Sequence, residues 1–168
     1  MKKLLLILLC LPMIGFGQKK DKFTKDIKEK YDKFEGSTKW HSPFYGKGIR
    51  ASVNNTIVFI KTKENNVYKT YVYFTTFSVK LTTSNSGAIV LFEDGYKMEF
   101  PLANVGYGNA KGSLWKYFSK IRINEEELNK FITTDVEAIR ISNYSNDIKR
   151  KKEKINTRGW AKAIKETF

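Results

Sequence analysis

Few residues in this sequence have the types and spacing for acid–base chemistry. His41 is the single histidine, and a histidine with an ordinary pKa of about 6.5 can act as a general base, but no GxSxG-like serine context accompanies it. Glu99 and the acidic runs Glu93-Asp94 and 125–127 could supply a glycosidase-type pair of carboxylates across a cleft. Both runs fall where acids are ordinary, in a turn and at a helix start. We expect no catalytic site, no cofactor and no metal site.

A run rich in aromatic residues offers a second kind of chemistry, the stacking of rings on a ligand. Aromatic side chains on an exposed sheet face stack on bases and on sugar rings. Strand alternation puts Tyr71 and Tyr73 on one face and Tyr68 and Phe74 on the other. Two interpretations fit this pattern. In the first, one face packs in the core and a flanking helix half-covers the other. In the second, one face is exposed and binds a ligand. The candidate stacking residues are Tyr68, Tyr71, Tyr73 and Phe74.

A basic segment near the C-terminus offers electrostatic chemistry. Residues 149–168 contain eight Lys or Arg and two acidic residues. A helix over 148–166 would carry Trp160 and Ile164 on one side, and could lie on a membrane surface. Packing of the same apolar residues onto a sheet is the favoured interpretation. The candidate contacts with an anionic surface are Lys149, Arg150, Lys151, Lys152 and Lys154.

The formal net charge of +14 over 168 residues is concentrated at the two ends of the chain. Residues 19–34 and 149–168 carry nine of the twelve positive charges that would remain after removal of residues 1–17. Most basic residues are Lys and only five are Arg, whereas Arg is preferred for bidentate phosphate recognition. We expect any polyanion binding to act from the flanks, and we do not expect nucleic acid as a partner.

Residues 1–17 have the pattern of a secretory signal peptide. A basic start precedes an apolar run over 4–11, and the small residues Gly15 and Gly17 precede a cleavage site before Gln18. The apolar run is shorter than the roughly 20 residues that span a bilayer. We predict a periplasmic or secreted protein without a transmembrane segment after cleavage. The mature chain would contain no cysteine, which excludes disulfides and thiolate sites.

The elements that must position these residues are mostly strands. Apolar residues at helical spacing predict that the basic segment 18–34 is a helix. Asn124 and Glu127 form a capping-box pattern, which predicts a helix near 124–133. Residues 103–113 lack a phosphate-binding motif and are predicted to be a surface loop. Strands are predicted at 38–42, 49–53, 56–62, 67–81, 88–92, 96–100, 114–121 and 136–142, with turns at 54–55, 65–66 and 94–95.

The even spacing of turn signals predicts a single mainly β (α+β) domain rather than βαβ units. We expect an antiparallel β-sandwich or curved meander sheet over 35–148, with one inserted helix. A break in the strand pattern falls at 84–86. A basic helix within 149–168 and the N-terminal helix would flank the sheet. The Asp94-Gly95 pair predicts a type I′ hairpin turn.

Four features together resemble small exported β-rich proteins of Bacteroidetes-type bacteria. They are the MKKLLLILL…GFGQ leader, the Lys-rich entry ending DKFEGSTKW, the EDG hairpin and the unit NEEELNKFITTDVEAIRIS. The resemblance implies a periplasmic or secreted domain and transfers no catalytic residues.

The leading hypothesis is a non-enzymatic exported binding or accessory protein. Alternatives are an envelope-associated protein that binds anionic surfaces through its basic flanks, and an inhibitor of an acidic partner protein. The ligand is unknown; since an exported protein meets little nucleic acid, sugars, lipopolysaccharide or peptidoglycan would be expected before nucleic acid as ligands of an exposed aromatic sheet face.

Overall fold

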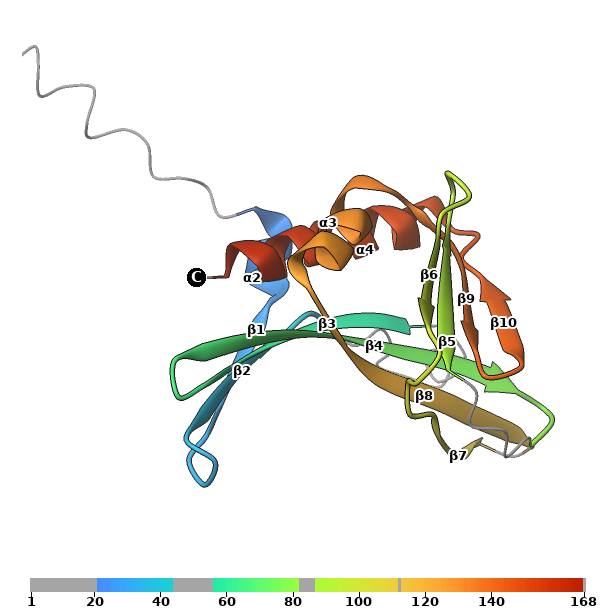
Figure 1. Ribbon diagram of the computed structural model, residues 1–168, viewed down its shortest axis with the longest axis horizontal. Coiled ribbons are helices and arrows are strands. Elements are labelled where there is room, and N and C mark those ends of the chain that lie inside the picture. The colour runs from blue at the N-terminus through green and yellow to red at the C-terminus, as the bar shows by residue number, and fades with distance from the viewer. Residues whose placement is uncertain (1–20, 44–55, 82–86, 112, 168) are drawn as a thin grey trace, which may run out of the picture.

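Two antiparallel sheets and three helices make up the part of the chain that the computed structural model describes, residues 21–43, 56–81, 87–111 and 113–167 (Figure 1). The elements are α2 (Lys22–Asp26), β1 (Lys28–Asp32), β2 (Ser37–His41), β3 (Thr56–Glu64), β4 (Val67–Ser78), β5 (Ala88–Phe92), β6 (Lys97–Phe100), β7 (Gly106–Lys111), β8 (Leu114–Ile123), α3 (Glu125–Thr133), β9 (Val136–Ile141), β10 (Tyr144–Asp147) and α4 (Lys151–Glu166).

The larger sheet has six strands in the order β1-β2-β3-β4-β8-β7, and the smaller has four in the order β10-β9-β5-β6. Every pair of neighbouring strands is antiparallel. The helices lie on one face of the six-stranded sheet, and the four-stranded sheet stands at a steep angle beside them (Figure 1). This arrangement confirms the predicted mainly β fold with antiparallel sheets and added helices.

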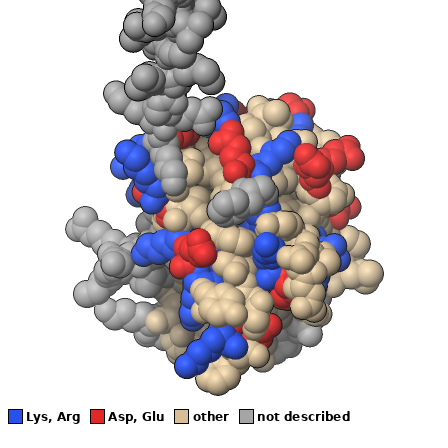
Figure 2. Space-filling view, turned by 90° about the vertical axis from the view of Figure 1, so that its left-hand side faces the viewer, with Lys and Arg blue, Asp and Glu red and all other residues tan. Residues whose placement is uncertain are grey.

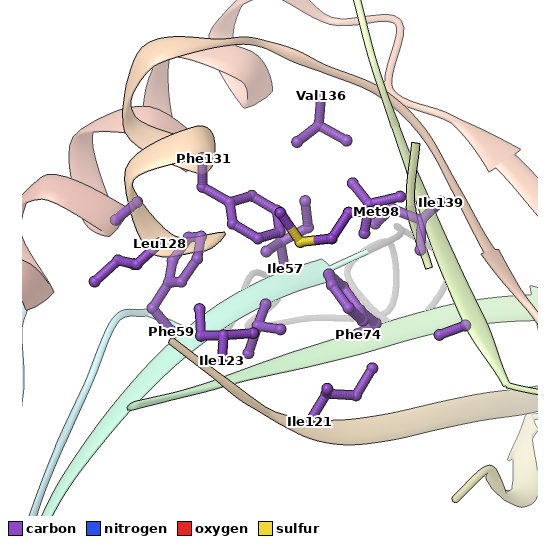
Figure 3. Close-up of a cluster of buried hydrophobic side chains, with 14 of the residues drawn as sticks. Ile57, Phe59, Phe74, Met98, Ile121, Ile123, Leu128, Phe131, Val136 and Ile139 are labelled. Carbon is purple, nitrogen blue, oxygen red and sulfur yellow. The ribbon is translucent and has the colours of Figure 1, made fainter. Parts of the chain in front are cut away.

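The core fills the space between the two sheets and the helices. Phe131 of α3 is fully buried, and its ring centroid lies 5.3 Å from that of Phe59 and 5.2 Å from that of Phe92. Figure 3 shows Phe131 pointing into this cluster. Trp160 and Ile164 of α4 are buried in the same core. The apolar side of α4 therefore packs on the protein, as the favoured interpretation of the sequence held.

The start of α3 confirms the predicted capping box. The Asn124 side chain accepts a hydrogen bond from the backbone N–H of Glu127 at 2.8 Å, and the Glu127 carboxylate accepts one from the backbone N–H of Asn124 at 2.7 Å. Both bonds satisfy backbone donors that have no partner within the helix. The helix therefore begins at the predicted residue.

Two hairpin turns were predicted from their residue pairs, with different outcomes. Asn65 and Asn66 have φ angles of 48° and 62°, which suit the two-residue turn between β3 and β4. In the second turn only Gly95 has a positive φ. Its N–H donates to the carbonyl of Phe92 at 2.9 Å, and the N–H of Phe92 donates to the carbonyl of Tyr96 at 3.0 Å. The loop therefore has three residues, and the predicted type I′ turn is wrong.

The predicted N-terminal helix is wrong beyond residue 26. Residues 28–32 form an edge strand of the larger sheet instead, paired with β2. Asp32 Oδ1 accepts hydrogen bonds from the backbone N–H groups of Phe34 and Glu35, and Gly36 has a φ of 59°, so the chain turns back as a hairpin. The sheet domain therefore begins before residue 35.

The glycine-rich segment and the region after Asn143 also differ from prediction. Residues 106–111 form β7, an edge strand paired with β8, rather than a loop. A Cβ atom on Gly106 would lie 2.5 Å from the ring of Phe118, so this glycine makes room for that ring.

Strand β10 was not predicted and pairs with β9. The predicted leader, the strand at 49–53, the turn at 54–55 and the break at 84–86 lie outside the described residues.

Candidate functional site

His41 and its neighbouring serine are occupied by structural contacts. The Nδ1 atom of His41 lies 3.0 Å from the carbonyl oxygen of Ser42, at hydrogen-bond distance. The Ser42 side chain is buried, and its hydroxyl accepts a hydrogen bond from the backbone N–H of Phe59 at 3.0 Å. These contacts join the end of β2 to β3, and they do not pair the imidazole with the hydroxyl.

The acidic runs singled out in the sequence hold elements together. Glu93 contacts the ammonium group of Lys154 on α4, and Asp94 contacts that of Lys130 on α3. The hydrogen bond from Lys130 lowers the pKa of the Asp94 carboxyl, with a further contribution from the backbone N–H of Tyr96. Glu99 lies apart from both runs, on β6. The acids around the turn therefore fasten the smaller sheet to the helices.

The four candidate stacking residues do not share one exposed face. Phe74 is fully buried in the core, so its prediction as a ligand-stacking residue is wrong. Tyr68 is 41% exposed, on the side of the sheet that faces the helices, and its ring lies 6.4 Å from that of Trp40. Tyr71 and Tyr73 are half-buried on the opposite side of the sheet. We call that side, turned away from the helices, the outer face.

Two of the lysines that line the hollow beside Tyr68, Lys61 and Lys165, make structural contacts. The hollow has a volume of about 360 Å³. The ammonium group of Lys61 donates to the carbonyl of Thr167 at 2.6 Å, at the C-terminal end of α4, and burial lowers the pKa of this lysine. Lys165 pairs with Glu125 at 3.2 Å. These cations fasten the end of α4 to the sheet and to α3.

One cross-strand row on the outer face brings together residues from five strands. Strand register places its members opposite one another from β1 through β2, β3 and β4 to β8. A basic side chain lies at each end of the row, and a histidine and an aromatic ring lie between the two. The members, in order, are Lys28, His41, Ile60, Tyr71 and Arg122.

Aromatic rings and lysines lie together on the outer face beside this row. The ammonium group of Lys120 lies 4.3 Å from the centroid of the Tyr71 ring, within range of a cation–π interaction. The rings of Tyr73 and Phe118 stack with their centroids 6.0 Å apart. Partial burial raises the pKa of the Tyr73 phenol, which keeps it neutral at physiological pH. The outer face therefore combines uncharged rings with cations.

Most cations of the outer face form no ion pair with another residue of the described ranges. At its hairpin end, Lys39 pairs with Glu35 at 2.8 Å and Lys69 pairs with Glu64 at 3.1 Å. Figure 2 views this end of the molecule and shows basic and acidic side chains interleaved. Elsewhere on the outer face, five basic side chains form no ion pair within the described ranges. They are Lys28, Lys30, Lys116, Lys120 and Arg122.

The C-terminal flank is more neutralised than its composition suggested. Six of its eight basic residues have an acidic side chain within 3.8 Å. Among the predicted surface contacts, Lys149 pairs with Asp147 and Arg150 with Glu153, while the side chain of Lys154 is only 17% exposed. Lys151 and Lys152 are exposed at the start of α4. Fewer free cations are gathered here than on the outer face.

Comparison with known proteins found no family model, no curated protein and no solved structure that matches this chain. In the part of the chain that the structure describes, no helix is both long and apolar enough to cross a membrane. The same residues contain no group of three or more His, Cys, Asp or Glu side chains placed to hold a metal ion.

Proposed function

We propose that this is an exported, non-catalytic binding protein that takes an anionic polysaccharide on its outer face. The observation that carries the proposal is the cross-strand row, in which Tyr71 lies beside Arg122 and under the ammonium group of Lys120. Rings stack on sugar rings, while lysines and arginines bind carboxylate or sulfate groups. A charged sugar polymer offers both kinds of partner.

The length of the row favours a polymer over a small ligand. It crosses five strands, and neighbouring strands lie about 4.8 Å apart, so it extends for about 19 Å. Cations at both ends, Lys28 and Arg122, would contact charges at separate positions along an extended chain. The low number of arginines fits a ligand whose charges are single carboxylates on a flexible polymer.

Binding through the C-terminal flank is the weaker alternative. Lys154 and Lys165 of that flank already contact Glu93 and Glu125, so binding a polyanion there would compete with contacts that hold α4 in place. The export part of the proposal rests on the pattern of residues 1–17. Mass spectrometry of the protein recovered from cells should show a chain that starts at Gln18.

The proposal is tested by comparing four soluble polymers in titration calorimetry. Polyuronate offers rings and carboxylates, dextran offers rings alone, polyglutamate offers carboxylates alone, and single-stranded DNA tests the nucleic-acid alternative. We expect the tightest binding to polyuronate, with affinity that falls as salt is added because counter-ions screen the lysines. Equal binding to polyglutamate, or tighter binding to DNA, would contradict the proposal.

A further inference from the structure

The four-stranded sheet also has a side that faces away from the core, and this side is hollowed. Two adjacent hollows of about 410 Å³ and 190 Å³ lie along it, and they share Ile89, Glu99 and Arg140 among their lining residues. The opposite side of the same sheet is already filled by the core, where Val90 and Ile139 are fully buried. We call the hollowed side the open face.

The open face carries apolar side chains where a one-sided antiparallel sheet usually presents polar ones. Ile89 and Leu91 of β5 and Ala138 of β9 are only half-buried there. Leu91 lies opposite Ala138 in the register of the two strands. The apolar residues therefore form a strip along β5, at the middle of the face.

Charged residues flank this strip in an ordered way. Ile89 lies opposite Glu99 of β6 on one side and opposite Arg140 of β9 on the other. The side chains of Glu99 and Arg140 are exposed, and neither side chain makes an ion pair or hydrogen bond with any residue in the described ranges. In the next row, Lys97 of β6 and Asp147 of β10 lie on opposite sides of the strip.

This order is self-complementary under two-fold symmetry. Two copies can face each other across a two-fold axis that runs parallel to β5, midway between their four-stranded sheets. Rotation about this axis places β6 of one copy over β9 of the other and keeps each residue in its own row. It places Glu99 of one copy against Arg140 of the other, and Arg140 against Glu99. Ile89 and Leu91 then face their own counterparts, and Lys97 comes next to Asp147. A two-fold interface uses the same patch on both copies, and facing sheets pack with nearly aligned strands.

We propose that the open face is a homodimer interface, in which a second copy of this chain packs its four-stranded sheet against the first. The face is four strands wide, about 14 Å across, so the interface would be smaller than a standard stable one. The dimer is therefore expected to dissociate at micromolar concentration. The proposal is independent of polysaccharide binding, because the outer face belongs to the other sheet.

Charge reversal tests the pairing through sedimentation velocity over a range of protein concentrations. Glu99→Arg would set two arginine side chains against each other in the dimer, and Arg140→Glu would set two glutamate side chains against each other. We expect each single variant to remain monomeric at concentrations where the unaltered protein is dimeric. A mixture of the two variants restores both opposite-charge pairs, so we expect it to sediment as a 1:1 dimer.

The matched control is Glu126→Arg, which reverses an exposed acid on α3, away from the open face. It should dimerise like the unaltered protein. Circular dichroism of each variant should show an unchanged fold, because the altered side chains are exposed. An unaltered protein that is monomeric at every concentration, or single variants that dimerise normally, would overturn the proposal. So would a mixture of the two reversed variants that stays monomeric.

Discussion

The ammonium group of Lys120 on β8 lies 4.3 Å from the centroid of the Tyr71 ring on β4. The two residues are 49 positions apart in the sequence, and they meet because β4 and β8 are neighbours in the six-stranded sheet. The contact holds a cation over a half-buried ring without neutralising its charge. A ligand with both a ring and an acidic group could use both residues, which is the basis of the proposed polysaccharide site.

Replacing Tyr71 by alanine should weaken polyuronate binding. Stacking on an aromatic side chain contributes about 1–3 kcal/mol per nucleobase, and we expect the low end for a sugar, which is about a five- to tenfold loss in affinity. Tyr71→Phe keeps the ring and should bind nearly as well as the unaltered protein. The control is Tyr107→Ala, a 46% exposed tyrosine on β7. A similar loss in that control would show that the effect does not come from the row.

Replacing Phe131 by alanine should strongly destabilise the fold. Its ring is fully buried against Phe59 and Phe92, which join α3 to both sheets. Removal of a buried phenylalanine ring costs about 3–5 kcal/mol in the free energy of unfolding. Urea denaturation followed by tryptophan fluorescence measures this cost. Phe131→Leu keeps more of the volume and should cost clearly less. A loss below about 1 kcal/mol for the alanine variant would contradict the described packing.

The Asp94–Lys130 pair predicts a specific dependence of stability on pH. The pKa of Asp94 is lowered in the folded protein from an ordinary value of 3.8, mainly by the hydrogen bond from Lys130. The unfolded chain therefore takes up this proton first, and the stabilisation present above pH 3.8 is lost as the pH falls through the folded pKa. Asp94→Asn should show a shallower fall in thermal midpoint in this window. Glu126→Gln is the control, and an equal change in both variants would contradict the assignment.

Gly87, at the start of β5, should not tolerate a side chain. Its φ is 40°, and an added Cβ would lie 2.6 Å from the carbonyl oxygen of Phe100. Both the backbone angle and the contact with backbone atoms oppose alanine, so Gly87→Ala should cost more than about 1 kcal/mol in the free energy of unfolding. At Gly108 an added Cβ meets nothing within 4 Å. Thermal unfolding should therefore show little effect of Gly108→Ala, and equal effects at both sites would be inconsistent with the structure.

The features that could be predicted from the sequence are those whose information lies within a few residues. The turn at Asn65 and Asn66 depends on two residues that tolerate positive φ. The capping box at α3 depends on Asn124 and on Glu127, three positions later. Neither needs a distant partner, so short patterns suffice.

Other elements depend on partners that short patterns do not contain. Phe23 and Ile27 pack against the core, as an amphipathic segment should, but Tyr31 and Phe34 are exposed on a hairpin. Their helical spacing was outweighed by pairing with β2. The glycines of β7 look like loop residues in the sequence, yet Gly106 is required by the distant ring of Phe118.

The candidate site illustrates the same limit. Alternation correctly separated Tyr71 and Tyr73 from Tyr68 and Phe74. It could not show which side faces the helices, because that depends on what packs against the sheet. The cross-strand row joins residues from position 28 to position 122 through four strand registers. Three of the six ion pairs of the C-terminal flank likewise connect it to Glu93, Glu125 and Asp135 elsewhere in the chain.

The central claim is that the outer face, rather than the C-terminal flank, binds the anionic polymer. It is tested most directly by the polyuronate affinities of two double charge reversals, Lys120→Glu with Arg122→Glu on β8 and Lys151→Glu with Lys152→Glu on α4. Both change the net charge equally, and all four side chains are exposed. We predict a loss of at least about tenfold for the first variant and within about twofold for the second. Equal losses, or a larger loss for the α4 variant, would contradict the account.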